Sequence, residues 1–542
     1  MITPETLEPG VVQPRLDGIL TGALRLYKKC SIFLGILLLS SQVGPLQANP
    51  QDLQHTVQGL PGSCPDVPLR NAAVQQELHA LYQQSAFAPV WVKPEQLTQL
   101  SAQLEQLADD GLNPANYPLP ALGGIPQNAC QEIQLSTAYL QALHDLRWGR
   151  LAQQALEPLW HSERTPPAQR PLTHNQLTLG DLALAFEEAR PALARYQRLR
   201  QSYAQARQSA LPEWPQIASG PLLKPGMQDP RLPLIEQRLI DEGYLPASTA
   251  NPQDVHYNAQ RLAALKEFQR QHALQDDGII GPGTLSELNI SPAQRRAQLR
   301  INLERWRWLA PIMDAETLLV DISAAQLSYY RDHQLLWKTR TQVGRAERPT
   351  PSLKSVMTRL SLNPTWTVPP TILKKDKIPA IQADPGFLAK HQMRVLDLQG
   401  QPLDPASIDW QRPGAIILRQ DAGPQNPLGR LALRFPNPFS VYLHDTPSLA
   451  LFEKAPRPFS SGCVRVEGVM RVLELLLSEA QRQQVDELLA GGKTVEYKLP
   501  GQVPIVMAYW TAEADEQGRP LYRPDIYGQD AKLIAALDTA TR

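Results

Sequence analysis

The sequence predicts a multidomain α+β protein with a helical N-terminal scaffold, a small three-helix unit and a β-rich C-terminal part that contains an insert. The chain has 542 residues, and at about 150 residues per domain this length gives three or four domains. Leucines recur at helical spacing in the first part, whereas short apolar runs separated by Gly and Pro prevail after Pro311. The 51 prolines are about twice the usual share of roughly 5%, which excludes one long helical array.

The charge balance narrows the classes of partner. Lys and Arg number 53, Asp and Glu number 53, and the formal net charge is zero. This balance argues against nucleic acid, which is held through its phosphates. Hydrophobic residues make up 42% of the chain, enough to build packed cores. Because the sequence has neither an HExxH nor a CxxC motif, we expect no metal and no cofactor.

Residues 1–48 have the order of a secretory signal. Basic residues precede a short apolar run from Ser31 to Leu39, and small and polar residues follow it. The run is shorter than the roughly 20 residues that span a bilayer comfortably. We therefore expect export with cleavage of this segment. Extended to Val43, the run could instead remain as an uncleaved anchor, which would be the chain's one membrane contact.

Export changes how the four cysteines are interpreted. Cys30 lies inside the predicted signal. In an oxidising compartment Cys64 and Cys130 are expected to pair, since both lie among Pro, Gly and Asn at the ends of one helical region. The alternative is two unrelated buried thiols. Either way one cysteine is left over, and an odd thiol in an exported protein indicates reactivity.

Composition and periodicity divide the exported chain. Residues 49–70, rich in Gln, Pro and Gly, are interpreted as a linker, and residues 71–220 as a helical scaffold that a helix at 291–310 completes. Residues 225–290 form a compact three-helix unit. Its turn contains Asp277, Gly278 and Gly281, and both glycines are expected to adopt positive φ.

Residues 311–500 are predicted to be mainly β. The stretch at about 368–412 differs, with a lysine-rich helix start, many prolines and few strand runs, and we interpret it as a flap over a site. Residues 501–542 are expected to pack on this domain as a C-terminal extension. The expected strands are Leu318–Ile322, Leu327–Tyr330, Leu335–Val343, Ala415–Leu418, Val441–Leu443 and Val495–Leu499.

The segment from Val441 to Gly468 carries the strongest chemical signal. His444 ends a predicted strand, and Cys463 follows a glycine at a turn. A thiol needs a base to ionise near neutral pH, and an imidazole can supply it. Arg465, two residues on, shares a strand face with Cys463 and could favour the thiolate or bind a carboxylate. From spacing alone, a buried thiol and an unrelated, satisfied histidine are the more common interpretation of such a pair.

A resemblance to a known family resolves this choice. The sequences HDTP at 444–447 and FSSGCVRV at 459–466 resemble the active-site motif of L,D-transpeptidases with a YkuD-type domain. PQNPLGR at 424–430 and WRWL at 306–309 resemble the large periplasmic Gram-negative subtype. The turn at Asp277–Gly281 resembles a three-helix peptidoglycan-binding module. The resemblance covers roughly residues 65–540 and implies a β-sandwich-like catalytic domain in the periplasm.

The resemblance also implies a mechanism. Cys463 attacks the third residue of a donor tetrapeptide stem, His444 acts as base, D-alanine leaves, and a second stem resolves the thioester as a 3→3 cross-link. Backbone N–H groups of Gly462 and Cys463 are expected to hold the oxyanion. Arg465 and three further residues are implied to bind substrate: Tyr442, Asn426 and Arg430. The flap at 368–412 excludes water, and carbapenems acylate the cysteine.

Two residues depart from the family's pattern. Ser461 stands where many members have His, and Gly468 where many have Asn. A backbone carbonyl near Ser461 is therefore expected to orient His444. With the same site, water as acceptor gives a carboxypeptidase and a lipoprotein lysine gives an anchoring enzyme. A non-catalytic wall-binding scaffold is a further alternative. The implied partners are peptidoglycan stem peptides and glycan, and other cell-wall synthesis enzymes.

Overall fold

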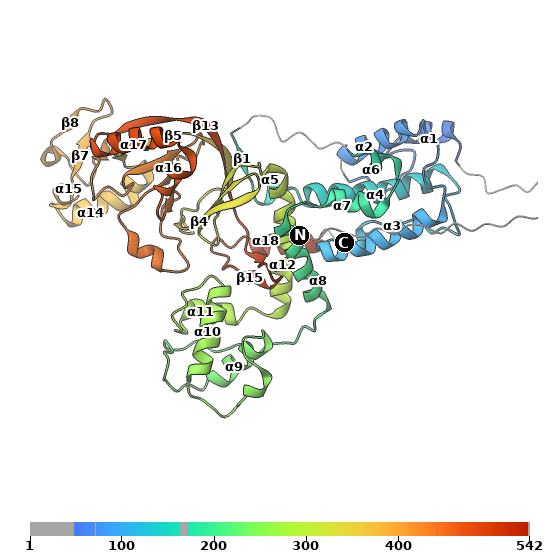
Figure 1. Cartoon of the computed structure of the whole chain (residues 1–542), viewed down its shortest axis with the longest axis horizontal. Helices are drawn as coiled ribbons and strands as arrows, with labels where there is room; N and C mark the ends of the chain where they lie inside the picture. Colours follow the sequence, from blue (N-terminus) through green and yellow to red (C-terminus); the bar gives the residue numbers. More distant parts are fainter. Residues whose placement is uncertain (1–47, 71, 163–171, 540–542) are drawn as a thin grey trace, which may run out of the picture. The chain divides into compact units, whose positions relative to one another are not determined.

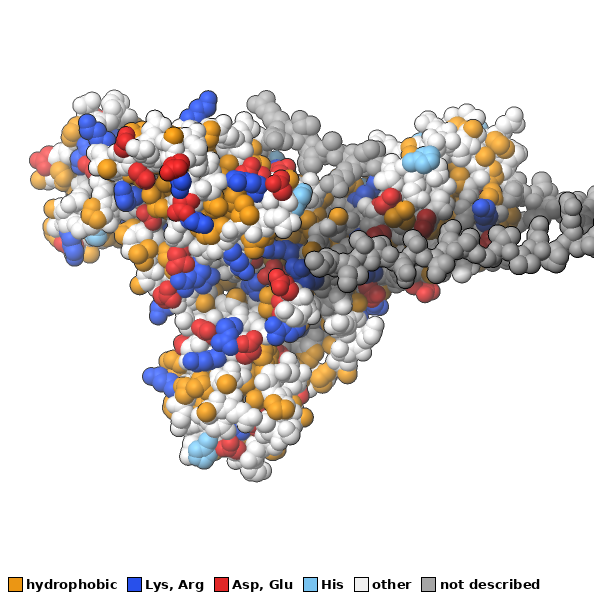
Figure 2. Space-filling view, in the orientation of Figure 1, with side chains coloured by type: hydrophobic (Ala, Val, Ile, Leu, Met, Phe, Trp, Pro, Cys, Tyr) orange, Lys and Arg blue, Asp and Glu red, His pale blue; other side chains and the backbone are white. Residues whose placement is uncertain are grey.

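The computed structural model describes residues 48–70, 72–162 and 172–539, and their elements are shown in Figure 1. The expected export segment lies outside the described residues, apart from Ala48. Within the described ranges, no helix is both long and apolar enough to cross a membrane. Figure 2 shows Lys and Arg interspersed with Asp and Glu on the visible face, in keeping with the zero net charge.

The N-terminal part is helical because each helix presents one apolar stripe to a shared core. Leu78, Leu104 and Leu143 are buried there. Side-chain caps satisfy orphan N–H groups: Asn128, for example, accepts from the N–H of Gln131 at the start of α4. The helices are α1 (Pro50–Gln58), α2 (Ala72–Gln84), α3 (Pro94–Gln106), α4 (Ala129–Trp148), α5 (Gln153–Leu156), α6 (His174–Thr178), α7 (Leu182–Ala189) and α8 (Ala194–Gln208).

The linker expected at 49–70 is wrong. This segment contains α1, whose Leu53 and Val57 are fully buried in the helical core. Its glutamines lie on the solvent face of the helix, which explains why composition alone resembled a linker. A disulfide joins Cys64, just beyond this helix, to Cys130 at the start of α4, with a Cα–Cα distance of 5.7 Å.

Helix α12 (Pro292–Leu309) joins sequence-distant parts through two buried guanidinium groups. Arg305 pairs with Glu157 at 2.6 Å and with Asp530 at 2.7 Å. Arg307, fully buried, pairs with Glu304 and donates to the backbone carbonyl of Asp110 at 2.7 Å. A buried charge is tolerated only when it is paired and hydrogen-bonded, so these partners fix where each segment lies against α12.

The three-helix unit is formed by α9 (Leu232–Asp241), α10 (Ala259–Gln271) and α11 (Pro282–Leu288) around Leu239, Leu265 and Phe268. Gly278 has φ of +72°, as expected, and its N–H donates to the Gln269 side chain at 2.9 Å. The expectation for Gly281 is wrong. Its φ is −103°, because it is the extended residue that precedes α11.

The β-rich part is built on one sheet with the strand order β1-β5-β10-β11-β12-β4-β3-β2-β13. Strand β13 also pairs with β5, so the sheet curves back on itself around one core. Helix α17 (Glu479–Ala490) packs against β5 and follows α16 (Arg471–Leu476) (Figure 1). The strands are β1 (Trp160–His161), β2 (Thr317–Asp321), β3 (Gln326–Arg331), β4 (Gln334–Gln342), β5 (Leu353–Leu362), β10 (Leu431–Arg434), β11 (Leu443–His444), β12 (Val464–Val466) and β13 (Val495–Ala508).

The insert has its own small sheet and core, and its edges lie outside the predicted 368–412. Its sheet order is β6-β9-β7-β8, around a core that includes Val368, Ile381 and Leu418. Few strand runs were expected, but the insert has four strands, and its first and last, at 366–367 and 417–420, pair with each other. Its elements are β6 (Trp366–Thr367), α13 (Pro370–Ile372), a π-helical turn (Leu373–Lys377), α14 (Ile378–Ala383), α15 (Phe387–Lys390), β7 (Met393–Leu396), β8 (Pro402–Leu403) and β9 (Ile417–Gln420).

Residues 501–542 do not form one extension on the catalytic domain. Residues through Ala508 belong to β13 and pair with β2 inside the sheet. After the hairpin of β14 (Ala512–Ala514) and β15 (Pro520–Tyr522), α18 (Asp530–Thr539) packs on α12 instead. The contact buries Leu533 and Leu537 of α18.

Removal of the disulfide should destabilise the helical part. The bridge closes a loop with a sequence separation of 66, for which chain entropy predicts a loss of about 4 kcal/mol. We expect the Cys64→Ser/Cys130→Ser variant to unfold at lower urea concentration, followed by far-ultraviolet circular dichroism. Cys463→Ser is the matched control and should unfold as the wild type does. Identical urea midpoints for the wild type with and without reductant would contradict this role.

Candidate active site

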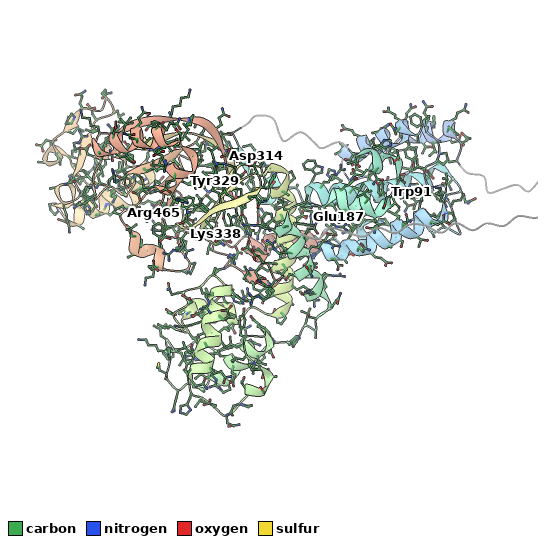
Figure 3. All side chains as sticks on the ribbon, in the orientation of Figure 1. Trp91, Glu187, Asp314, Tyr329, Lys338 and Arg465 are labelled. Carbon is green, nitrogen blue, oxygen red and sulfur yellow. A yellow bond between two sulfur atoms is a disulfide. The ribbon has the colours of Figure 1, made fainter. Side chains whose placement is uncertain are left out.

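Two adjacent parallel strands position the predicted reactive residues. In the pairing of β11 with β12, Leu443 faces Val464 and His444 faces Arg465. The chain returns to β12 through a loop that ends at Ser460–Cys463, so Cys463 lies directly before β12. Arg465 lies within the β-rich part (Figure 3). Residues separated by about 20 positions thus meet because the two strands are neighbours.

Cys463 and His444 line one cleft of about 810 Å³. Gly462 turns the chain into the cleft with φ of +113°, a conformation that favours glycine. Four cationic side chains, two from the loop between β4 and β5, one from β12 and one from the insert, share the cleft with one carboxylate, that of Asp376. The cleft is therefore suited to an anionic ligand. The lining includes Arg345, Arg348, Pro349, Pro351, Trp366, Asp376, Lys377, His391, Phe439, Tyr442, His444, Ser461, Gly462, Cys463 and Arg465.

His444 is held as a neutral base. Its Nδ1 lies 2.5 Å from the backbone oxygen of Asp445, so Nδ1 carries the proton and Nε2 is the acceptor. The orienting carbonyl therefore belongs to the next residue and not to the region of Ser461, as the sequence had led us to expect. Burial, with a smaller contribution from the charge of Arg465, lowers the pKa of His444 to about 3, against the opposing bond to Asp445. The imidazole is uncharged at neutral pH.

Cys463 is likewise neutral in this structure. Burial raises the pKa of the Cys463 thiol above its ordinary value. The backbone N–H of Tyr442 and the charges of Arg434 and Arg465 oppose this shift but do not reverse it. Thiol and imidazole are thus both in their uncharged forms.

The expected oxyanion donors are only partly available. The N–H of Gly462 donates to Ser460 Oγ at 3.1 Å, while the Ser460 hydroxyl donates to the Cys463 carbonyl at 2.5 Å. The Gly462 carbonyl accepts from Thr350 Oγ1 at 2.9 Å. The turn is thus fixed by side-chain hydroxyls, and the Gly462 N–H is already engaged in the absence of substrate.

Sequence reasoning missed an ion pair that connects the insert to the reactive loop. Arg348 donates two hydrogen bonds to Asp376, each 2.6 Å long, and a third to Ser461 Oγ at 3.0 Å. Arg345 also donates to Ser461 Oγ, at 3.3 Å. Ser461 therefore anchors two arginines. No local pattern signals this contact, because Asp376 lies 28 residues from Arg348.

The predicted substrate-binding residues divide into two groups. Arg465 and Tyr442 line the cleft, with Arg465 bonded to Gln342 at 2.9 Å and the Arg434 guanidinium 3.9 Å from the Tyr442 ring centre. Arg434 was missed because it lies 29 residues before Cys463 and meets the site only across the sheet.

The other two predicted substrate-binding residues, Asn426 and Arg430, lie outside the cleft lining. Asn426 is buried, and its amide donates to the carbonyls of Pro364 and Asp421 at 3.0 Å each, so it shapes a turn. Arg430 is exposed, and its backbone N–H donates to Asp445 Oδ2 at 2.9 Å. Neither side chain lines the cleft.

The residues of the three-helix unit form a separate turn. Asp277 is exposed and its Oδ1 accepts from the N–H of Ile279 at 2.8 Å, which holds the turn at Gly278. Within the described ranges, no group of three or more His, Cys, Asp or Glu side chains could hold a metal ion. Cys463 is a free thiol.

Comparison with known families agrees with this geometry. Residues 315–483 match the L,D-transpeptidase catalytic domain, and this range contains His444, Cys463 and Arg465. The chain carries an L,D-transpeptidase catalytic domain. Residues 228–288 match a peptidoglycan-binding domain, and residues 76–202 match a scaffold domain. The predicted α+β architecture of helical part, three-helix module and β-rich L,D-transpeptidase domain is confirmed.

A curated protein of Haemophilus influenzae named "Putative L,D-transpeptidase" is 35% identical over 282 residues. The match covers 51% of this chain and 55% of the relative, so the chain spans about half of that protein. The solved L,D-transpeptidase from Mycobacterium smegmatis aligns at 15% identity over 36% of this chain and 58% of that one, with a TM-score of 0.18. That from Stackebrandtia nassauensis aligns at 14% identity over 54% and 96%, with a TM-score of 0.19. At such scores the domain assignment rests on the sequence matches.

The neutral thiol predicts a distinct pH profile for alkylation of Cys463 by iodoacetamide. Because only the thiolate reacts and the thiol pKa is raised, the rate should rise about tenfold per pH unit from about pH 7 to about pH 9 without a plateau. Arg465→Gln should slow alkylation further, since it removes a charge that favours the thiolate. A plateau near neutral pH, read by intact-protein mass spectrometry, would indicate a thiolate–imidazolium pair instead.

Proposed function

We propose that this protein is a peptidoglycan L,D-transpeptidase that forms 3→3 cross-links through a thioester on Cys463. The carrying observation is the convergence of a neutral thiol and an Nδ1-anchored imidazole in a cationic cleft, inside the segment that matches the catalytic domain. This convergence supports the assignment of a nucleophile, a base and carboxylate-binding groups to one site.

The first step is acylation. As Sγ of Cys463 attacks the carbonyl of the third residue of a tetrapeptide stem, Nε2 of His444 accepts the thiol proton. The C–N bond to D-alanine then breaks, and the imidazolium returns the proton to the leaving amine. Between these two proton transfers the ring is an imidazolium, which the Asp445 carbonyl stabilises at Nδ1. This bond fixes the ring orientation throughout both transfers.

The cationic lining supports a stem peptide as substrate. Arg345 and Arg465 lie in the cleft with Cys463, and a stem presents carboxylates on its third and fourth residues. Arg348 is less available to a substrate carboxylate, because both of its terminal nitrogens already bond to Asp376. Arg345 also lies near Asp376, at 3.6 Å, but 43% of its side chain is exposed, so it is the more accessible of these two guanidinium groups.

The second step favours an amine over water. The side-chain amine of another stem's third residue attacks the thioester, and the thiol is released. The insert supplies Trp366, Ile372 and Lys377 to the cleft lining, which reduces the solvent around the thioester. The peptidoglycan-binding domain would keep the enzyme on its insoluble substrate, and the substrate implies export to the periplasm.

The decisive assay supplies disaccharide-tetrapeptide and identifies products by mass spectrometry. We expect dimers that have lost one D-alanine from the wild type and none from Cys463→Ala. Arg359→Ala, exposed on β5, is the matched control and should retain activity. Tripeptide monomers without dimers would contradict transpeptidation and indicate a carboxypeptidase. Dimers from Cys463→Ala would exclude the assigned nucleophile.

Carbapenem acylation tests the base separately from the natural substrate. We expect a single carbapenem adduct on Cys463 in the wild type. The His444→Ala variant should acylate about 10²–10⁴ times more slowly, because no other base removes the thiol proton. The measurement is the time course of the intact protein's mass at neutral pH. Equal rates for both proteins would argue that Cys463 is already ionised, contrary to the neutral pair described above.

A further inference from the structure

A second cleft of about 670 Å³ adjoins the reaction cleft. The two share Pro349, Pro351 and Phe439. The shared wall is close to the reactive thiol, because Phe439 precedes Ser440, whose carbonyl oxygen is 4.0 Å from Cys463 Sγ. A substrate that reacts at Cys463 can therefore extend from one cleft into the other.

The second cleft is built partly by the N-terminal half of the chain. Trp160 begins β1, which pairs with the start of β5. Its backbone N–H donates to the Ser352 carbonyl at 3.2 Å. Its ring meets Phe439 edge to face, with the centres 6.3 Å apart. On another wall, Tyr527 stacks on Tyr509, and its hydroxyl is held by Gly344 and Thr350. The aromatic lining is thus rigidly supported.

Charge distinguishes the two clefts. The reaction cleft is lined by several cationic side chains, whereas the second cleft is lined by aromatic rings together with neutral amides and hydroxyls, such as Gln154, Gln529 and Ser352. Its carboxylate, Glu157, is bound through both oxygens by Arg305. The charged groups of a peptide would find few opposite charges to pair with in the second cleft. A neutral, amide-bearing ring system would pack its apolar faces on the aromatics and bond to the amides.

We propose that the second cleft binds the N-acetylated sugar chain of the substrate while the stem peptide lies in the reaction cleft. The proposal rests on the function proposed above. The stem peptide is long enough to join the two clefts. The reacting carbonyl lies three residues from the sugar, and three extended residues span roughly 10 Å. The cleft thereby makes the enzyme prefer stems attached to glycan over free peptides.

The test compares kcat/KM for disaccharide-tetrapeptide with kcat/KM for the same tetrapeptide without sugar. We expect the wild type to prefer the sugar-bearing substrate. Trp160→Ala should reduce this preference about five- to tenfold by removing an aromatic contact, and Trp160→Phe should restore most of it. Gln529→Ala, on a half-buried side chain, provides a second variant that does not touch the sheet. Leu184→Ala, 48% exposed on α7, is the control and should keep the wild-type ratio.

A peptide-free oligomer of N-acetylglucosamine tests sugar binding separately, as a competitor of the two substrates. It should inhibit turnover of the sugar-bearing substrate in the wild type and not turnover of the free peptide. An equal preference ratio in the wild type, Trp160→Ala and Gln529→Ala would overturn the proposal, as would inhibition of both substrates alike. If the wild type turned over neither substrate, the proposed function would fail. Saturation-transfer NMR of the oligomer against wild type and Trp160→Ala would then still decide whether the cleft binds sugar.

Discussion

The pairing of two buried guanidinium groups on α12 is the constraint on which the arrangement of the chain depends. Neither Arg305 nor Arg307 could be buried without a partner, because removal of one partner from a buried pair typically costs about 3–5 kcal/mol. The partners come from the segments around Asp110, Glu157 and Asp530. One helix therefore holds three regions that lie far apart in sequence. Because Glu157 is one of them, the same pairing fixes the strand that follows it, β1, on the catalytic sheet.

The reactive residues depend on a second, more local constraint. Parallel pairing of β11 with β12 brings together two residues from opposite ends of a long loop. The strands place His444 and Cys463 in one cleft, where desolvation lowers the pKa of His444 together with the nearby positive charges and raises the pKa of Cys463 against them. The same desolvation that keeps the pair neutral strengthens every hydrogen bond made to a developing charge during the reaction. The arginines of the cleft therefore do not turn the pair into a thiolate and an imidazolium.

Sequence patterns predicted the elements that have strong local signals. Leucine spacing, helix caps and the glycine at 278 identified α3, α4 and the three-helix module, and alternating apolar runs identified β2, β3 and β4. Strand β5 was missed because Lys354, Ser355 and Arg359 interrupt its apolar run, although it is central to the sheet. The glutamine-rich face of α1 concealed its two buried residues.

At the site, a specific motif predicted Cys463 and His444 as nucleophile and base, and both residues line one cleft. The motif did not indicate their surroundings, because Arg345 and the Arg348–Asp376 pair reach the cleft, and the charge of Arg434 acts on Cys463, only through tertiary contacts. Asn426 had the residue type of a ligand-binding side chain, but its amide is used by neighbouring carbonyls. Local pattern therefore indicates which chemistry is present, while the electrostatic setting emerges only from the fold.

The neutral state of Cys463 has a consequence for the lifetime of the enzyme. Oxidants and foreign disulfides react with thiolates far faster than with thiols. A free cysteine held in its protonated form is therefore slow to react with either of them. Burial at this one residue gives the protein a reactive group that withstands long idle periods between encounters with substrate.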